Sequence, residues 1–256
     1  MIRVTLQARA YGPYRKWLLR TLKTDLERTF ADLDVDIVGL DTEMRGHVIV
    51  DMEGEDVEFA ANVLGLEYGT VPSFDQLSTG FCARGYIVEV GRVGYGLYVD
   101  IGVIEPARVD ALIPLHKLRF QLAMERSLRY IARTWVLADH LPVEVKLTDV
   151  NRTNQTIEAE LSEETLARLR RWAEDDHERL LVLGVTRKII DRALYETGHT
   201  SDIYEVESLG VYEYALVCKR STRASGILAA IGPALRGVPI HLFIPNEVKA
   251  NLDGAT

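Results

Sequence analysis

The sequence is poor in cysteine: its 256 residues contain only two, Cys82 and Cys218. Two cysteines cannot build the disulfide framework of a small secreted domain, so a cytoplasmic setting is expected. The chain also lacks an apolar run near the ~20 residues that a membrane-spanning helix needs, and its N-terminus does not resemble a signal peptide. These absences predict a soluble cytoplasmic protein with no membrane partner.

Positive charge is also scarce, since 30 lysines and arginines face 38 acidic residues and leave a net charge of −8. Nonspecific nucleic-acid binding comes mostly from Lys and Arg side chains that neutralise phosphates. An acidic chain can still bind RNA through a local basic patch, or it can bind basic proteins instead. Composition leaves both alternatives open.

Motifs of catalysis and cofactor binding are missing as well. Gly91, Gly94 and Gly96 do not make a dinucleotide fingerprint, because Val99 stands where the third glycine would fall and a strand is predicted to follow. The six histidines lack metal-ligand spacing, and no Gly-x-x-x-x-Gly-Lys-Ser/Thr loop occurs. We therefore expect no enzymatic activity, no cofactor and no metal site.

The most informative stretch runs from residue 85 to residue 115. It holds strand-like runs at residues 86–90, 95–101 and 111–115, with a glycine-rich corner between the first two. Gly94 and Gly96 permit the tight bend or bulge that a small barrel needs. The sequence therefore predicts three successive strands of one sheet.

The second of these strands alternates with period two, which is typical of a strand with one buried face. Leu97, Val99 and Ile101 are predicted to point into the core, while Tyr98 and Asp100 point outward. An outward tyrosine beside a glycine leaves room for a nucleic-acid base to stack.

These residues resemble the S1 RNA-binding domain, a module with the OB fold. The segments GYIVEV (85–90), YGLYVDIG (95–102) and ALIP (111–114) match its first three strands in order and spacing. Residues 141–150 and 157–162 resemble its last two strands, so the likeness covers about residues 83–162. It implies a five-stranded barrel that binds RNA.

The resemblance also implies which residues bind RNA. The two aromatic residues that stack bases in S1 domains are Tyr95 and Tyr98 here, and we add Arg92 from the corner beside them. The family's third-strand histidine is replaced by Pro114, and its acidic contact between the last two strands falls near Asn151. The two departures weaken the expectation of strong RNA affinity.

An insertion separates the third and fourth predicted strands. Residues 116–138 have helical periodicity and are expected to form a helix. This insertion contains a cluster of basic residues: Lys117, Arg119, Arg126, Arg129 and Arg133. They either contact RNA phosphates beside the barrel or form an ordinary solvated helix face.

Elements on both sides of the barrel alternate between helix and strand. Before it we expect a strand at 2–9, a helix at 14–32, strands at 35–40 and 47–52, a helix at 55–68 and a linker at 69–80. After it we expect helices at 162–183 and 186–197, strands at 202–209 and 211–219, a helix at 221–235 and a strand at 238–244. The basic start of the helix at 221–235 either holds a phosphate or only packs closely. The polar tail beyond Pro245 is expected to fray.

The whole layout is also similar to an archaeal protein family of unknown function. The segments that carry this likeness are EYGTVPSF (67–74), YGLYVDIGV (95–103) and the glycine-containing helix near the C-terminus. It implies an architecture and an archaeal origin but no activity.

The predicted fold class is therefore a multidomain α+β protein. Residues 1–80 form an α+β domain, residues 81–162 an S1-like OB barrel with the helical insertion at 116–138, and residues 163–256 a helical and α+β domain. The leading hypothesis is a non-catalytic RNA-binding protein of archaeal translation, transcription or RNA processing. The alternative is a protein-interaction module that binds a partner of that machinery through the barrel and an acidic surface.

Overall fold

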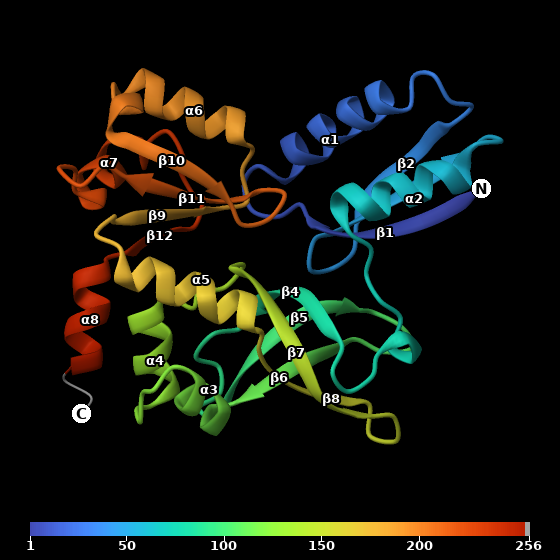
Figure 1. Ribbon diagram of the computed structural model, residues 1–256. Helices are drawn as coiled ribbons and strands as arrows, with labels where there is room; N and C mark the ends of the chain where they lie inside the picture. Colours follow the sequence, from blue (N-terminus) through green and yellow to red (C-terminus); the bar gives the residue numbers. More distant parts are fainter. Residues whose placement is uncertain (254–256) are drawn as a thin grey trace.

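The computed structural model describes residues 1–253, which form two open sheets and one closed barrel flanked by helices (Figure 1). The predicted mixture of helices and strands with a central five-stranded barrel is confirmed. Each sheet has its own cluster of buried apolar side chains.

The N-terminal unit is a three-stranded antiparallel sheet with two helices. Its elements are β1 (Ile2–Arg9), α1 (Arg15–Thr29), β2 (Asp36–Thr42), β3 (His47–Glu53) and α2 (Val57–Tyr68), and its strand order is β1-β3-β2. Leu18, Leu22 and Leu26 recur every fourth residue along α1 and are buried against the sheet. The short helix η1 (Phe74–Gln76) then leads to the barrel.

The barrel closes in the order β4-β5-β6-β8-β7. Its strands are β4 (Cys82–Val88), β5 (Gly96–Val103), β6 (Val109–Pro114), β7 (Pro142–Asn151) and β8 (Thr156–Leu161). β6 and β8 pair in parallel, while the other pairs are antiparallel. Gly96 is needed for this packing, because a Cβ there would lie 2.6 Å from the carbonyl oxygen of Ile113 on the neighbouring strand.

The insertion at 116–138 is two short helices, so the expectation of a single helix is wrong. They are α3 (Leu115–Gln121) and α4 (Leu128–Trp135). Ala123 has a φ of 49°, which no helix interior adopts, and Ser127 accepts a hydrogen bond from the N–H of Tyr130 as an N-cap. The apolar periodicity of the sequence continues through the break, but the helical conformation of the backbone is interrupted there.

The C-terminal unit is a four-stranded sheet in the order β10-β11-β9-β12. Its elements are β9 (Arg179–Leu183), α6 (Arg187–Glu196), η2 (Thr200–Asp202), β10 (Ile203–Ser208), β11 (Glu213–Cys218), α7 (Ala224–Ile231), β12 (Ile240–Phe243) and α8 (Pro245–Asp253). As far as Asp253, α8 corrects the expectation of a fraying tail, since Val248 is buried in the same core cluster as the barrel. The rest of that tail, residues 254–256, lies outside the described residues.

The helix expected at 162–183 also ends earlier than predicted. α5 (Glu163–Glu174) stops at Asp175, whose backbone is extended and whose carboxylate binds Arg179 and the N–H of His177. Residues 179–183 instead form β9, with every side chain buried. The helix itself packs on the barrel, because Leu166 and Trp172 belong to the barrel's core cluster.

The three units meet at the turn between β10 and β11. Tyr212, from this turn, is buried in the core cluster of the N-terminal unit. Gly184 lies so close to Tyr11 that a Cβ on this glycine would be 2.7 Å from the tyrosine ring. Side chains of the N-terminal and C-terminal units therefore interlock beside the barrel.

Candidate nucleic-acid interface

The two predicted stacking residues form a pair on the outside of the barrel. The hydroxyl groups of Tyr95 and Tyr98 are 2.8 Å apart, and their rings meet edge to face with centroids 6.4 Å apart. Tyr95 is 58% exposed and Tyr98 is half-buried. The hydrogen bond to Tyr95, together with partial burial, raises the pKa of Tyr98 to about 12, so the Tyr98 ring is neutral at physiological pH.

The local backbone explains why both rings lie outside. Within β5, Leu97 and Val99 point into the core, so Tyr98 points outward as the alternation predicts. Tyr95 precedes the first residue of the strand, so the alternation does not apply to it. Its carbonyl accepts a hydrogen bond of 2.8 Å from the N–H of Leu115, which ties this corner to the start of α3.

Asp100 was expected to point to solvent beside Tyr98, but it is only 1% exposed. The N-terminal unit covers it: Nε2 of His47 and Nη1 of Arg45 both lie 3.5 Å from its carboxylate oxygens. Burial disfavours the charged form of Asp100, but His47, Arg9 and the N–H of Gly102 outweigh burial and lower its pKa. Half of the outer face of β5 is therefore an internal contact between units.

A polar cluster that the sequence did not predict continues from this contact into the C-terminal unit. The buried guanidinium of Arg9 lies over the rings of Tyr86 and Tyr11, with distances to the centroids of 4.8 Å and 5.5 Å. The Tyr11 hydroxyl donates a 2.9 Å hydrogen bond to Glu213, and the ring of His140 stacks on Tyr11 at 4.2 Å. Burial raises the pKa of Glu213 to about 7, and burial lowers the pKa of His140 to about 4.

Several basic residues of the insertion already have partners within the chain. Nζ of Lys117 contacts Thr148 and lies 3.5 Å from Glu158, while Nε of Arg119 donates to the carbonyl of Arg126. The Arg126 guanidinium lies 5.7 Å from the centre of the Tyr130 ring. α4 packs beside α8 (Figure 1).

The remaining predicted residues are Arg92, Arg129, Arg133 and Asn151. Arg129 and Arg133 are exposed on α4. Arg92 lies close enough to Tyr98 to act on its ionisation, and it pairs with Glu89. Asn151 supports a turn, since its side-chain oxygen accepts the N–H of Asn154 at 2.9 Å. The structure therefore brings Tyr95 and Tyr98 into contact, with Arg92 close to Tyr98.

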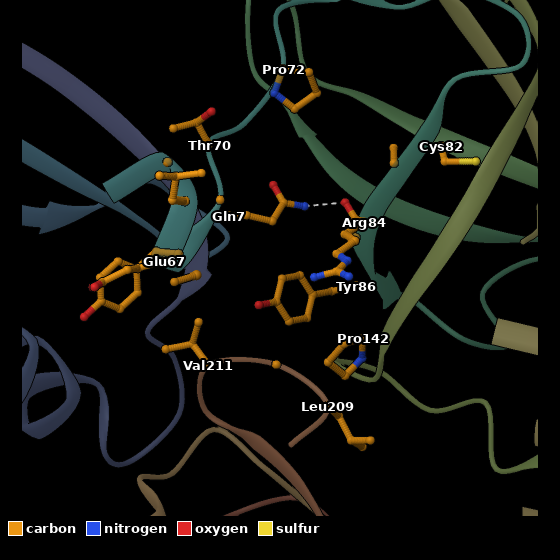
Figure 2. Close-up of a pocket in the computed structure, with 18 of the residues that line it drawn as sticks. Gln7, Glu67, Thr70, Pro72, Cys82, Arg84, Tyr86, Pro142, Leu209 and Val211 are labelled. Atoms are coloured by element: carbon orange, nitrogen blue, oxygen red, sulfur yellow. Dashed lines mark hydrogen bonds between the residues drawn. The ribbon is translucent and has the colours of Figure 1, made fainter. Parts of the chain in front are cut away.

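A crevice of about 700 Å³ lies between all three units (Figure 2). Gln7, Tyr86, Pro142 and Leu209 line it, and Nε2 of Gln7 donates a hydrogen bond to the carbonyl of Arg84 across one side. The crevice could not be predicted from the sequence, because its walls come from five separate segments.

Other predicted sites have simpler explanations. The start of α7 does not offer a free phosphate site, because the Glu178 carboxylate accepts the N–H of Ala224 at 2.8 Å and pairs with Arg223. Cys218 is buried, and burial raises the pKa of its thiol to about 12. Among residues 1–253 no group of three or more His, Cys, Asp and Glu side chains could hold a metal ion, and none of the helices combines the length and the apolar character of a membrane span.

Solved structures offer only weak similarities. The uncharacterised protein MJ1198 from Methanocaldococcus jannaschii is 15% identical over 34% of this chain and 96% of its own, with a TM-score of 0.25. The a/eIF2alpha-aDim2p-rRNA complex from Pyrococcus horikoshii gives 13% identity over 48% of this chain and 64% of that chain, with a TM-score of 0.26. The intact alpha subunit of aIF2 from Pyrococcus abyssi is 10% identical over 66% of this chain and 97% of its own, with a TM-score of 0.25. Scores this low do not establish a shared fold.

Family models give a clear assignment. The DUF2110 N-terminal domain matches residues 3–74, the DUF2110 central domain matches residues 77–173, and the DUF2110 C-terminal domain matches residues 177–242. No protein with a curated description matches the chain. The three models together span most of the sequence, and the chain therefore belongs to the DUF2110 family of unknown function.

Proposed function

We propose that this protein is a non-catalytic RNA-binding protein of archaeal translation, transcription or RNA processing. One observation carries the proposal: Tyr95 and Tyr98 present neighbouring rings on the outside of the barrel, at the start of β5. Aromatic rings placed in this way stack on unpaired bases of any sequence. The archaeal setting and the three processes come from the family resemblance alone.

We further propose that the barrel is an S1-like OB fold. The strand order β4-β5-β6-β8-β7 supports this assignment, as do the S1-like segments that fall on the first three strands. OB folds bind oligonucleotides on the face of their second and third strands, which correspond to β5 and β6. The tyrosine pair lies at the part of this face that the N-terminal unit leaves open.

In this proposal stacking contributes more to affinity than charge does. The cations near this part of the barrel are already paired: Lys117 lies near Glu158, Arg119 near Glu125 and Arg92 near Glu89. A protein that neutralises few phosphates releases few counterions, so its affinity depends weakly on salt. We therefore expect a shallower salt dependence than the basic insertion alone would suggest.

The test is a fluorescence anisotropy titration of labelled single-stranded RNA with wild type and Tyr98→Ala at fixed salt. Loss of one stacked base costs about 1–3 kcal/mol, so affinity should fall roughly 5- to 150-fold. Tyr195→Ala is the matched control, because Tyr195 is 80% exposed on α6 of the C-terminal unit. Equal affinity of wild type and Tyr98→Ala would remove this face from the RNA site.

A protein partner is the second candidate, and the paired charges around the barrel favour it. Arg92 and Glu89, Lys117 and Glu158, and Arg119 and Glu125 place both signs of charge close together. A surface of this kind suits a protein partner with complementary charges better than a polyanion. A crosslinking pull-down from native cells, with and without ribonuclease, separates the two: partners that survive ribonuclease support this second function.

A further inference from the structure

The crevice between the three units has no part in the proposed RNA binding, because neither Tyr95 nor Tyr98 lines it. Its walls come from β1 and β4, from the end of α2 with the linker behind it, from Pro142, and from the turn between β10 and β11. Its volume of about 700 Å³ lies within the range of small-molecule sites, which occur preferentially where domains meet. The crevice is therefore a candidate site in its own right.

One wall of the crevice contains the side chain of Tyr86, from β4. Only 4% of Tyr86 is exposed, and its hydroxyl makes no hydrogen bond to any residue of the described range 1–253. The hydroxyl is nevertheless not sealed off by protein atoms. Figure 2 shows it directed toward the middle of the crevice. Tyr86 thus presents a polar group to the crevice that the protein itself does not satisfy.

The ring of Tyr86 is held in this orientation by its neighbours. The Arg9 guanidinium lies over it, and the His47 ring meets its edge with centroids 6.2 Å apart. Burial raises the pKa of Tyr86 well above the ordinary value of 10.0, so the phenol keeps its proton and can donate it. A buried donor without an acceptor is costly. An acceptor on a molecule in the crevice would therefore be stabilised by Tyr86.

The rest of the lining is mostly apolar and has no net charge. Its apolar side chains include Leu66, Pro72, Phe81, Ala83, Leu209 and Val211. Within residues 1–253 the charged side chains that line it are Glu67 and Arg84, which are opposite in sign. Walls of this kind, with a polar group at a fixed position, are typical of sites for uncharged and largely apolar ligands.

We propose that the crevice binds a small, uncharged and largely apolar molecule, and that a carbonyl oxygen or ring nitrogen of this molecule accepts a hydrogen bond from the Tyr86 hydroxyl. The apolar side chains supply the contact area, and Tyr86 fixes the orientation of the ligand. This activity goes beyond the proposed RNA binding and does not depend on it.

Two probes that differ in one carbonyl group test the proposal: acetophenone and ethylbenzene. Each is titrated into the isotope-labelled full chain, and binding is followed by the amide chemical shifts of crevice residues such as Gly69, Arg84 and Val211. Tyr86→Phe keeps the ring against Arg9 and removes only the hydroxyl. It should weaken acetophenone binding roughly fivefold, because one neutral hydrogen bond is lost, and should leave ethylbenzene binding unchanged.

Tyr195→Phe is the matched control, because it removes a phenol hydroxyl from an exposed position that does not line the crevice. It should leave the binding of both probes unchanged. The proposal would be overturned if neither probe shifted the crevice amides at millimolar concentration. It would also be overturned if Tyr86→Phe weakened both probes equally or weakened neither.

A second measurement on the wild-type chain does not require any variant to fold. Cys82 is exposed and lines the crevice, whereas Cys218 is buried, so alkylation by iodoacetamide reports on Cys82. Saturating acetophenone should slow this alkylation, because the bound probe covers part of the crevice. An unchanged rate would place the probe elsewhere on the protein and contradict the proposal. Since both measurements are made without RNA, they can fail independently of the Tyr98 test.

Discussion

The outer face of β4 and β5 has two halves that differ in solvent exposure. At one end Tyr98 is partly exposed, and at the other Tyr86 and Asp100, which pair across the two strands, are buried under the N-terminal unit. All three residues point outward from the barrel by the same period-two rule. The local sequence pattern therefore determines which way a side chain points, whereas contacts from a distant segment determine whether that side chain is exposed to solvent.

The largest expected effect separates the two halves by stability. Tyr86→Ala should lower the free energy of unfolding by about 3–5 kcal/mol, as for other large-to-small changes at buried aromatic positions. It removes the ring that Arg9 lies against, so a buried guanidinium also loses its contact. Tyr98→Ala, the matched change on the open half, should barely alter the urea denaturation midpoint. Similar losses for both variants would show that the two halves are not distinct.

The second prediction concerns Glu213, which is fully buried where the C-terminal unit meets Tyr11. Its folded-state pKa of about 7 lies above the ordinary value of 4.5, so the folded protein binds the proton more tightly than the unfolded chain. The stability that this proton contributes is complete below about pH 4.5 and is lost as pH rises through about 7.

Glu213→Gln should remove this pH dependence. Relative to the variant, the wild-type unfolding free energy should fall by about 3 kcal/mol between about pH 4.5 and about pH 8. Urea denaturation of both proteins across this range measures the difference. If the unfolding free energies of wild type and variant changed with pH in parallel, Glu213 would be ionised in the folded protein at all these pH values.

The sequence predicts much of the fold because its local signals are strong. The alternation of Leu97, Val99 and Ile101 identifies a strand of the barrel, and the four-residue spacing of Leu18 and Leu22 identifies α1. The S1-like segments also lead directly to the tyrosine pair. These features depend on neighbours within a few residues along the chain.

The rest could not be predicted, because it depends on contacts between distant segments. Four buried polar residues lie where the N-terminal unit contacts the barrel and the C-terminal unit: Arg9, His47, Asp100 and Glu213. Nothing near any of them in the sequence indicates a buried partner. The end of α5 was missed for a related reason: the apolar residues before and after Asp175 fit one helical stripe, although those after it are strand residues. Periodicity alone does not distinguish a buried helix segment from a buried strand.

A third prediction concerns the tyrosine pair itself. The hydrogen bond from its neighbour raises the pKa of Tyr98, so Tyr95→Phe should lower the pKa of Tyr98 toward the ordinary value of 10.0. Alkaline titration followed by tyrosinate absorbance measures this change, with Tyr195→Phe as a control that removes one phenol elsewhere. An unchanged high-pH transition in Tyr95→Phe would show that the two rings do not interact in solution.

The smallest expected effect concerns the charges that surround the open half. If RNA lies across the tyrosines, Arg92 is the basic residue nearest to them along the chain, in the corner that leads into β5. For single strands each neutralised phosphate changes the slope of log affinity against log salt by about 0.7, so Arg92→Gln should make the slope shallower by about that amount. Arg133→Gln on α4 removes the same charge from a helix that packs beside α8, and it should leave the slope unchanged. Anisotropy titrations of one RNA at several salt concentrations measure both slopes. If Arg133→Gln changed the slope and Arg92→Gln did not, the RNA path would run over the insertion rather than over the open half of the barrel face.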